Sequence, residues 1–172
     1  MGKKFELTDK FIINVFGIKL FQIKCTKSFK YAQKGDLGGY VEKEGNLDQE
    51  NDAWVSGDAW VSGNARVSGN AWVSGNAQVS GNARVSGNAQ VSGDANIKNN
   101  NEHCGFDGFG SCNRHTHAYL TKEKKVEITC GCFRGSIEEF EKKVEETHSG
   151  TIYEKQYKAI INVIKIKFGL TD

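Results

Sequence analysis

A six-residue repeat fills the middle of this chain and constrains its fold more than any other feature. From Ala53 to Asp94 the sequence repeats Ala-x-Val-Ser-Gly-Asn/Asp seven times, and a degenerate eighth copy follows at Ala95. Self-similarity at six residues is typical of hexapeptide β-helices. In Ala-x-Val the side chains alternate in, out and in, and Ser-Gly-Asn turns the corner because Gly and Asn accept a positive φ. The repeat predicts a parallel β-helix of about three coils, which we expect to be left-handed.

The register of the repeat extends backward beyond Ala53. Val41 and Leu47 fall at the Ala position, so we assign the β-helix to residues 41–100. Three hexads make one coil, which stacks the outward side chains in three columns. These columns are Trp54, Trp72 and Gln90; Trp60, Gln78 and Asn96 above Glu42; and Arg66 and Arg84 above Asp48.

Residues 1–40 are strand-like and precede the repeat. Two apolar runs, 11–16 and 18–25, flank Gly17 and predict a β-hairpin. A solenoid end without a cap exposes apolar side chains and unpaired backbone groups. We therefore expect the hairpin to cap the first coil.

Residues 101–172 predict a small α+β module. The Asn-rich and Gly-rich segment 99–110 is expected to be a loop, and strands are expected at 115–121 and 125–129. The fold class is therefore mainly β, with a left-handed parallel β-helix between an N-terminal hairpin cap and this module.

Two helices are expected near the end of the chain. Ser136 and Glu139 form the pattern of a capping box at the start of the first helix. The second helix fits the apolar spacing that begins at Tyr153. Its tail, 161–168, alternates with period two, so it fits either a helix or a strand.

Charge and cysteine content indicate the compartment and the partners. The net charge is +2, although residues 1–35 hold eight lysines against Glu6 and Asp9. No apolar run reaches the roughly 20 residues of a membrane span, and the N-terminus lacks an apolar signal-peptide core. An odd number of cysteines without a secretory signal indicates reduced thiols. We expect a protein of the bacterial cytoplasm, with no membrane or duplex nucleic acid as partner.

The residues after the repeat include a group of possible zinc ligands. They are Cys104, Cys112, Cys130 and Cys132, with His103, His115 and His117. Their spacings do not form the paired C-x2-C pattern of zinc sites. We expect reduced structural thiols, no metal and no cofactor, with zinc as the alternative.

Trp54, Trp60 and Trp72 point outward by the period-two pattern. Three large aromatic side chains on flat sheet faces would leave a sticky patch on a monomer. We expect a homotrimer that buries them at its interface, or their burial under the C-terminal segment; base stacking on the rings is the functional alternative. Arg66 above Arg84 suits an anion in a cleft between subunits, or is a solvated charge ladder.

Three pieces of the chain resemble a family of phage and prophage hexapeptide-repeat proteins. They are Phe5-Glu-Leu-Thr8 with Gly35-Asp-Leu-Gly-Gly-Tyr-Val-Glu42, the hexad array, and Gly131-Cys-Phe-Arg-Gly-Ser136-Ile-Glu-Glu-Phe140. The resemblance covers nearly the whole chain and implies a phage-encoded accessory protein working in the bacterial cytoplasm. Cys112, His115 and His117 depart from that family's pattern, so the resemblance implies no chemistry for them.

The function that we expect is capture of an anionic small molecule of nucleotide type, by which a phage counters a host antiviral defence. The start of a helix at Ser136 supplies amides for phosphate, Arg134 and Gly135 precede it, and a Gly-rich loop adds polar and aromatic groups. The expected ligand-binding residues are Arg134, Gly135, Ser136, Ser111, Asn113, Arg114, Phe109, Arg66 and Arg84.

Three other functions also fit the sequence. One is an inhibitor that binds a host defence protein, and another is a structural adaptor. The third is a hexapeptide-repeat acyltransferase, by analogy with the fold alone. Such enzymes use a His as general base, whereas all four His of this chain lie outside the repeat. We therefore expect no catalytic residue.

Overall fold

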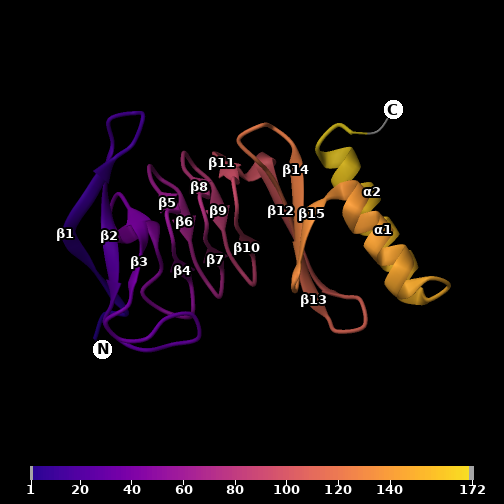
Figure 1. Ribbon diagram of the computed structural model, residues 1–172, viewed down its shortest axis with the longest axis horizontal. Coiled ribbons are helices and arrows are strands. Elements are labelled where there is room, and N and C mark those ends of the chain that lie inside the picture. Colours follow the sequence, from indigo (N-terminus) through magenta and orange to yellow (C-terminus); the bar gives the residue numbers. More distant parts are fainter. Residues whose placement is uncertain (1, 171–172) are drawn as a thin grey trace. The chain divides into compact units, whose positions relative to one another are not determined.

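The computed structural model describes residues 2–170 (Figure 1). The chain forms two compact units. One unit ends at Asn100 and the other begins at Asn101. No helix among the described residues is long and apolar enough to cross a membrane.

The hexads form a parallel β-solenoid, as the repeat predicted. Each hexad contributes one two-residue strand. The strands are β4 (Trp54–Val55), β5 (Trp60–Val61), β6 (Arg66–Val67), β7 (Trp72–Val73), β8 (Gln78–Val79), β9 (Arg84–Val85), β10 (Gln90–Val91) and β11 (Asn96–Ile97). They stack as three parallel faces, β5-β8-β11, β4-β7-β10 and β6-β9. Trp54 pairs with Trp72 and Trp72 with Gln90, which confirms the period of one coil.

Small inward side chains and glycine corners make the stacking possible. Every inward Ala and Val of the hexads is at most 1% exposed. The repeat glycines have φ between 60° and 67°. The expectation of a positive φ at the repeat asparagines is wrong, because Gly alone takes that conformation there. The asparagines form a ladder instead, in which Asn64 donates to Asn82 at 3.3 Å and Asn70 to Asn88 at 3.2 Å.

The first coil does not keep the register that the sequence predicted. Val41 pairs with Val61 and Leu47 with Val67, so both occupy the Val position and not the Ala position. Eight residues separate Leu47 from Val55, where later hexads have six. The two extra residues lie in the corner 48–52, which we call the wide corner.

The register shift changes two of the predicted columns. Tyr40, and not Glu42, pairs with Trp60. Asp48 donates its backbone N–H to Val67 O at 2.9 Å, so it lies level with Ser68 and not beneath Arg66. A larger inward side chain fits the Val position, which explains why Val and Leu stand there.

The predicted N-terminal hairpin is confirmed. Strands β1 (Phe5–Ile13) and β2 (Lys19–Cys25) are antiparallel, and β2 pairs with β3 (Leu37–Val41). Because β3 also pairs with β5, the hairpin extends the β5-β8-β11 face of the solenoid. A short 3-10 helix, η1 (Glu44–Asn46), follows β3.

Residues of the same chain cover the three tryptophans. Phe29 packs edge-on against Trp54, with ring centroids 5.4 Å apart, and Trp54 is 2% exposed. Tyr31 stacks on Trp72 at 5.6 Å, and Trp60 packs in a cluster with Leu20 and Tyr40. Burial of these rings therefore needs no second subunit, and the homotrimer stays a prediction.

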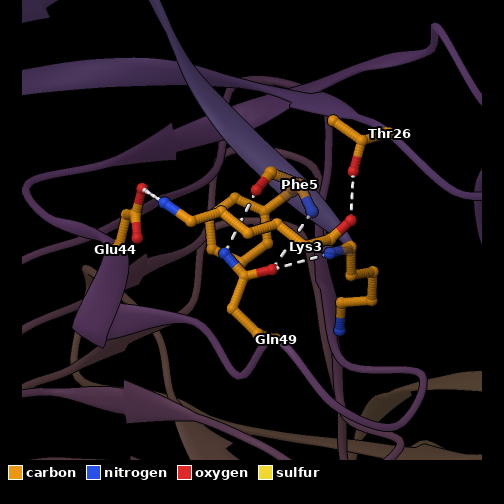
Figure 2. Close-up of polar contacts among 6 residues, drawn as sticks. Lys3, Phe5, Thr26, Glu44 and Gln49 are labelled. Carbon is orange, nitrogen blue, oxygen red and sulfur yellow. Dashed lines mark hydrogen bonds and ion pairs between the residues drawn. The ribbon is translucent and has the colours of Figure 1, made fainter. Parts of the chain in front are cut away.

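The wide corner is bound to the start of β1. Gln49 accepts hydrogen bonds from the backbone N–H groups of Lys4 (2.8 Å) and Phe5 (3.2 Å) and donates one to Phe5 O (Figure 2). The buried Lys4 ammonium donates to the carbonyls of Glu50, Asn51 and Ala53 at 3.2, 3.2 and 2.7 Å. Burial lowers the pKa of Lys4 to about 8. The inserted residues therefore hold the N-terminal strand in place.

The second unit is an antiparallel sheet followed by two helices. After η2 (Asn100–Glu102) the elements are β12 (His103–Phe109), β13 (Arg114–Leu120), β14 (Val126–Cys130), β15 (Phe133–Ser136), α1 (Ile137–His148) and α2 (Ile152–Lys167). The strands pair in chain order. Ile137, Phe140, Ile160 and Ile164 of the helices share a buried core with Ala118 and Ile128 of the sheet.

Two expectations for this unit need correction or completion. The segment 99–110 was expected to be a loop, yet residues 103–109 form β12, because β13 supplies partners for its backbone. The segment 161–168, which fitted a helix or a strand, is helical as far as Lys167.

Stacking of glycine corners can be tested with a matched pair of variants. A Cβ on Gly75 would lie 2.9 Å from Gly93 N, whereas a Cβ on Gly87 would meet nothing within 4 Å. Both positions have a positive φ, so either alanine costs about 1–2 kcal/mol. We expect Gly75→Ala to cost about 1–3 kcal/mol more than Gly87→Ala in urea unfolding, because its methyl group separates two coils. Equal losses would contradict this account of the corners.

The anchoring of the wide corner predicts unequal roles for two neighbouring lysines. Lys4→Met leaves three carbonyls without their donor and should lower the free energy of unfolding by about 1–3 kcal/mol. Lys3 forms an exposed ion pair with Glu44, so Lys3→Met should change it by about 0.5 kcal/mol or less. Thermal and urea unfolding of the two variants check the difference. A Lys4→Met variant as stable as Lys3→Met would refute the anchor.

Candidate functional site

The three faces of the solenoid differ in what covers their outward side chains. Trp60 lies under the hairpin, and Trp54 lies under Phe29. On the β6-β9 face, by contrast, Arg66 and Arg84 are exposed and paired side by side. They border a groove of about 470 Å³, whose lining residues are Asp48, Asn51, Arg66, Ser68, Gly69, Arg84 and Ser86.

The wide corner builds one wall of this groove. It contributes Asp48 and Asn51, and Asn51 has a φ of 53° that lets the longer corner bend. The solenoid contributes Ser68 and Ser86, one coil apart.

The electrostatics of the groove favour an anion. Adjacent parallel strands are about 4.8 Å apart, and like charges directly opposite each other on such strands repel. Within residues 2–170 neither Arg66 nor Arg84 forms a salt bridge. A phosphate or carboxylate accepts from two guanidinium groups at once. The carboxylate of Asp48 adds an acceptor for a donor group on the same ligand.

The helix start at Ser136, where the sequence predicted an anion site, is capped by side chains of the helix itself. Ser136 Oγ accepts from Glu139 N at 3.2 Å, and the Glu139 carboxylate accepts from Ser136 N at 2.8 Å, as the capping-box pattern predicted. Arg134 is engaged by Glu127 at 2.5 Å. A Cβ on Gly135 would lie 2.5 Å from the Glu139 carboxylate, so that side chain lies directly over the glycine.

The other predicted residues of this unit do not converge on a pocket either. Phe109 packs against the helix core. Ser111 is exposed in the β12–β13 turn, and Asn113 adopts a φ of 48° there. The Arg114 side chain lies against Gly131, where an added Cβ would be 2.7 Å from it. Of the predicted set, Arg66 and Arg84 line the groove on the β6-β9 face.

The structure brings the predicted histidines together and leaves the cysteines apart from them. All five cysteines are free thiols, and Cys112 and Cys132 are exposed whereas Cys130 is buried. Burial raises the pKa of Cys104 to about 11, which keeps that thiol protonated. No cluster of three or more metal-ligating side chains is present among residues 2–170, so the zinc alternative gains no support there.

The histidines form a hydrogen-bonded chain that ends on a carboxylate. Asp107 Oδ1 lies 2.7 Å from His115 Nδ1, His115 Nε2 lies 3.2 Å from His117 Nδ1, and His117 Nε2 lies 3.3 Å from His103 Nδ1. A Cβ on Gly105 would be 2.7 Å from the His115 ring. Glycine at that position on β12 therefore lets the rings lie over the strand. Sequence reasoning grouped these histidines as metal ligands and did not find the chain, because the role of Asp107 depends on its pairing across the hairpin.

With one proton on each ring, the carboxylate of Asp107 sets the direction of the chain. An ionised carboxylate only accepts, so His115 Nδ1 donates to Asp107 and His115 Nε2 accepts from His117. By the same reasoning, His117 Nε2 accepts from His103. His103 Nε2 is then unprotonated, and it is buried without a hydrogen-bond partner among the described residues. All three rings donate toward Asp107 in this arrangement.

Burial makes this chain resist protonation. It holds the pKa of His117 well below its usual range, and the neighbouring His103 and His115 lower it further. Burial and then the charge of Lys167 lower the pKa of His103, while Glu102 opposes them. In the unfolded chain both rings regain an ordinary pKa near 6.5.

Stability should therefore depend on pH. Below about pH 6.5 the unfolded state binds more protons than the folded state, so the free energy of unfolding falls as the pH decreases. We expect urea unfolding to show lower stability at pH 5.5 than at pH 7.5, and His117→Gln to reduce that difference. If His117→Gln leaves the difference unchanged, the depressed pKa of His117 is not its cause.

The comparison with known families agrees with the solenoid. Residues 59–75 and 77–93 match the family described as YdcK Beta solenoid repeat. No curated protein matches the sequence significantly. Both matched segments lie in the stacked coils that carry Arg66 and Arg84. The chain is a β-solenoid repeat protein.

Proposed function

We propose that this chain is a non-enzymatic binding protein that captures a phosphate-bearing small molecule in the groove of Arg66 and Arg84. The observation that carries the proposal is the pair of adjacent, exposed guanidinium groups without a salt bridge within residues 2–170. The groove also brings two of the predicted ligand-binding residues together with Asp48, Asn51, Ser68 and Ser86.

The chemistry of the lining residues fits a nucleotide better than a simple anion. Arg66 and Arg84 supply paired donors for phosphate oxygens. Ser68 and Ser86 carry hydroxyls that donate to the same group. Asp48 accepts from a ribose hydroxyl or a base amino group. A ligand with a phosphate at one end and hydrogen-bond donors at the other uses both sides of the groove.

Within this proposal, the same residues serve capture and not turnover. The groove is lined by no imidazole and no thiol, and the three chained histidines belong to the other unit. An acyltransferase of the hexapeptide class needs a histidine base beside its thioester. The groove therefore supports binding without a reaction.

The resemblance to phage and prophage proteins supplies the biological setting of the proposal. A phage protein that sequesters a nucleotide immune signal protects the phage from the host defence that the signal activates. Cyclic dinucleotides and ADP-ribose derivatives are therefore the first ligands to test. The homotrimer belongs to this proposal, because a second subunit on the β6-β9 face would enclose the ligand.

Calorimetric titration tests the proposal. We expect at least one of these nucleotides to bind more tightly than about 100 μM, and Arg66→Gln with Arg84→Gln to weaken binding about tenfold or more. Arg134→Gln is the matched control, because Glu127 already engages that guanidinium, and it should leave the affinity unchanged. The proposal fails if no phosphate ligand binds, or if only Arg134→Gln reduces the affinity.

A further inference from the structure

The β1–β2 hairpin has one covered face and one bare face. Ile12 pairs with Leu20, and both pack against the cluster that contains Trp60. Phe11 and Ile13 point to the opposite face, because side chains alternate along a strand. They are 44% and 65% exposed. The hairpin therefore uses only half of its apolar surface to extend the solenoid.

The turn of the hairpin adds two more exposed apolar side chains. Val15 is 91% exposed and Phe16 is 69% exposed. The turn is nevertheless ordered by Asn14, whose Oδ1 accepts from the backbone N–H groups of Phe16 and Ile18 at 3.0 Å each. Gly17 closes the turn with a φ of 77° and donates to Asn14 O. We call residues 11–19 the hairpin tip.

Two lysines flank the apolar surface of the tip. Lys19 pairs with Ile13, and its Nζ lies 3.9 Å from the centroid of the Phe11 ring and 4.9 Å from that of Phe21. Lys10 is exposed directly before Phe11, whereas Lys24 pairs with Glu6 near the other end of the hairpin. The whole-chain charge of +2 predicted no membrane partner, but that value does not show that Lys10 and Lys19 lie beside these exposed apolar side chains.

We propose that the hairpin tip docks on an anionic lipid surface. Val15 and Phe16 enter the boundary between headgroups and acyl chains, where aromatic and aliphatic side chains gain from burial. Lys10 and Lys19 meet anionic headgroups, and each lysine near such a surface strengthens binding roughly fivefold. The proposal goes beyond ligand capture and uses another surface of the N-terminal unit.

Two other occupants fit the tip less well. In a symmetric contact with a second copy, the lysines of both tips would face each other and repel. A stable protein interface buries at least about 1,000 Å², whereas the tip is a narrow turn with four exposed apolar side chains. A lipid surface needs no matching shape, so a small apolar tip flanked by Lys10 and Lys19 is sufficient for docking.

Vesicle sedimentation with the full chain tests the proposal. We expect binding to phosphatidylcholine vesicles that contain about one-third phosphatidylglycerol, at least about tenfold tighter than to pure phosphatidylcholine, and weaker in added salt. A double variant, Val15→Ser with Phe16→Ser, should lose about tenfold or more in affinity without a change of charge. Its melting temperature should equal that of the original chain, because both side chains are exposed.

A second variant locates the lipid-binding surface. Ile166 on α2 is 59% exposed and lies in the other unit, so Ile166→Ser should leave vesicle binding unchanged. The proposal is overturned if the original chain binds neither kind of vesicle, in which case an acidic protein becomes the occupant to seek. It is equally overturned if Val15→Ser with Phe16→Ser binds as tightly as the original chain.

Discussion

The spacing between stacked coils is the constraint on which the N-terminal unit depends. Parallel strands lie about 4.8 Å apart, so every corner must repeat at that distance with no side chain in the way. Glycine with a positive φ and no Cβ satisfies this at the corners of the repeat hexads, and Gly75 lies against Gly93 with no space for a methyl group. Alanine and valine then fill the interior, which is the same in each coil of the repeat. Because the interior is uniform, anything specific to this protein must lie on the outward columns or at the interruptions of the repeat.

The wide corner is the main interruption, and it links the fold to the proposed site. Its two extra residues change the register of the first coil. The corner also accepts hydrogen bonds from the Lys4 ammonium through Glu50 and Asn51, and it brings Gln49 to the backbone of β1. On the other side of the same corner, Asp48 and Asn51 form a wall of the groove that contains Arg66 and Arg84. A local insertion therefore holds the N-terminal strand and shapes the groove.

The two units provide hydrogen-bond partners for their buried polar groups in different ways. In the solenoid, backbone groups pair from coil to coil and the asparagine side chains repeat the pattern as a ladder. In the second unit, three imidazole rings lie on the β12–β13 hairpin. They form a chain of hydrogen bonds that ends on the carboxylate of Asp107. Burial lowers the pKa of His117 and His103, so protonation of these two rings destabilises the folded unit.

The sequence by itself determined the solenoid, because a six-residue period with Ala, Val and Gly at constant positions has few other ways to bury its apolar side chains. It also determined the hairpin and the cap of α1 at Ser136, since both depend on residues close in the chain. Only the tertiary structure decided the register of the first coil, because Val41 and Leu47 fit the count of six yet are too large for the Ala position. It also decided which donors stay open: Glu139 occupies the helix start at Ser136 and Glu127 occupies Arg134, whereas Arg66 and Arg84 have no such neighbour within residues 2–170. Local patterns name the groups that can bind an anion, but contacts between distant residues determine which of those groups are already bound within the chain.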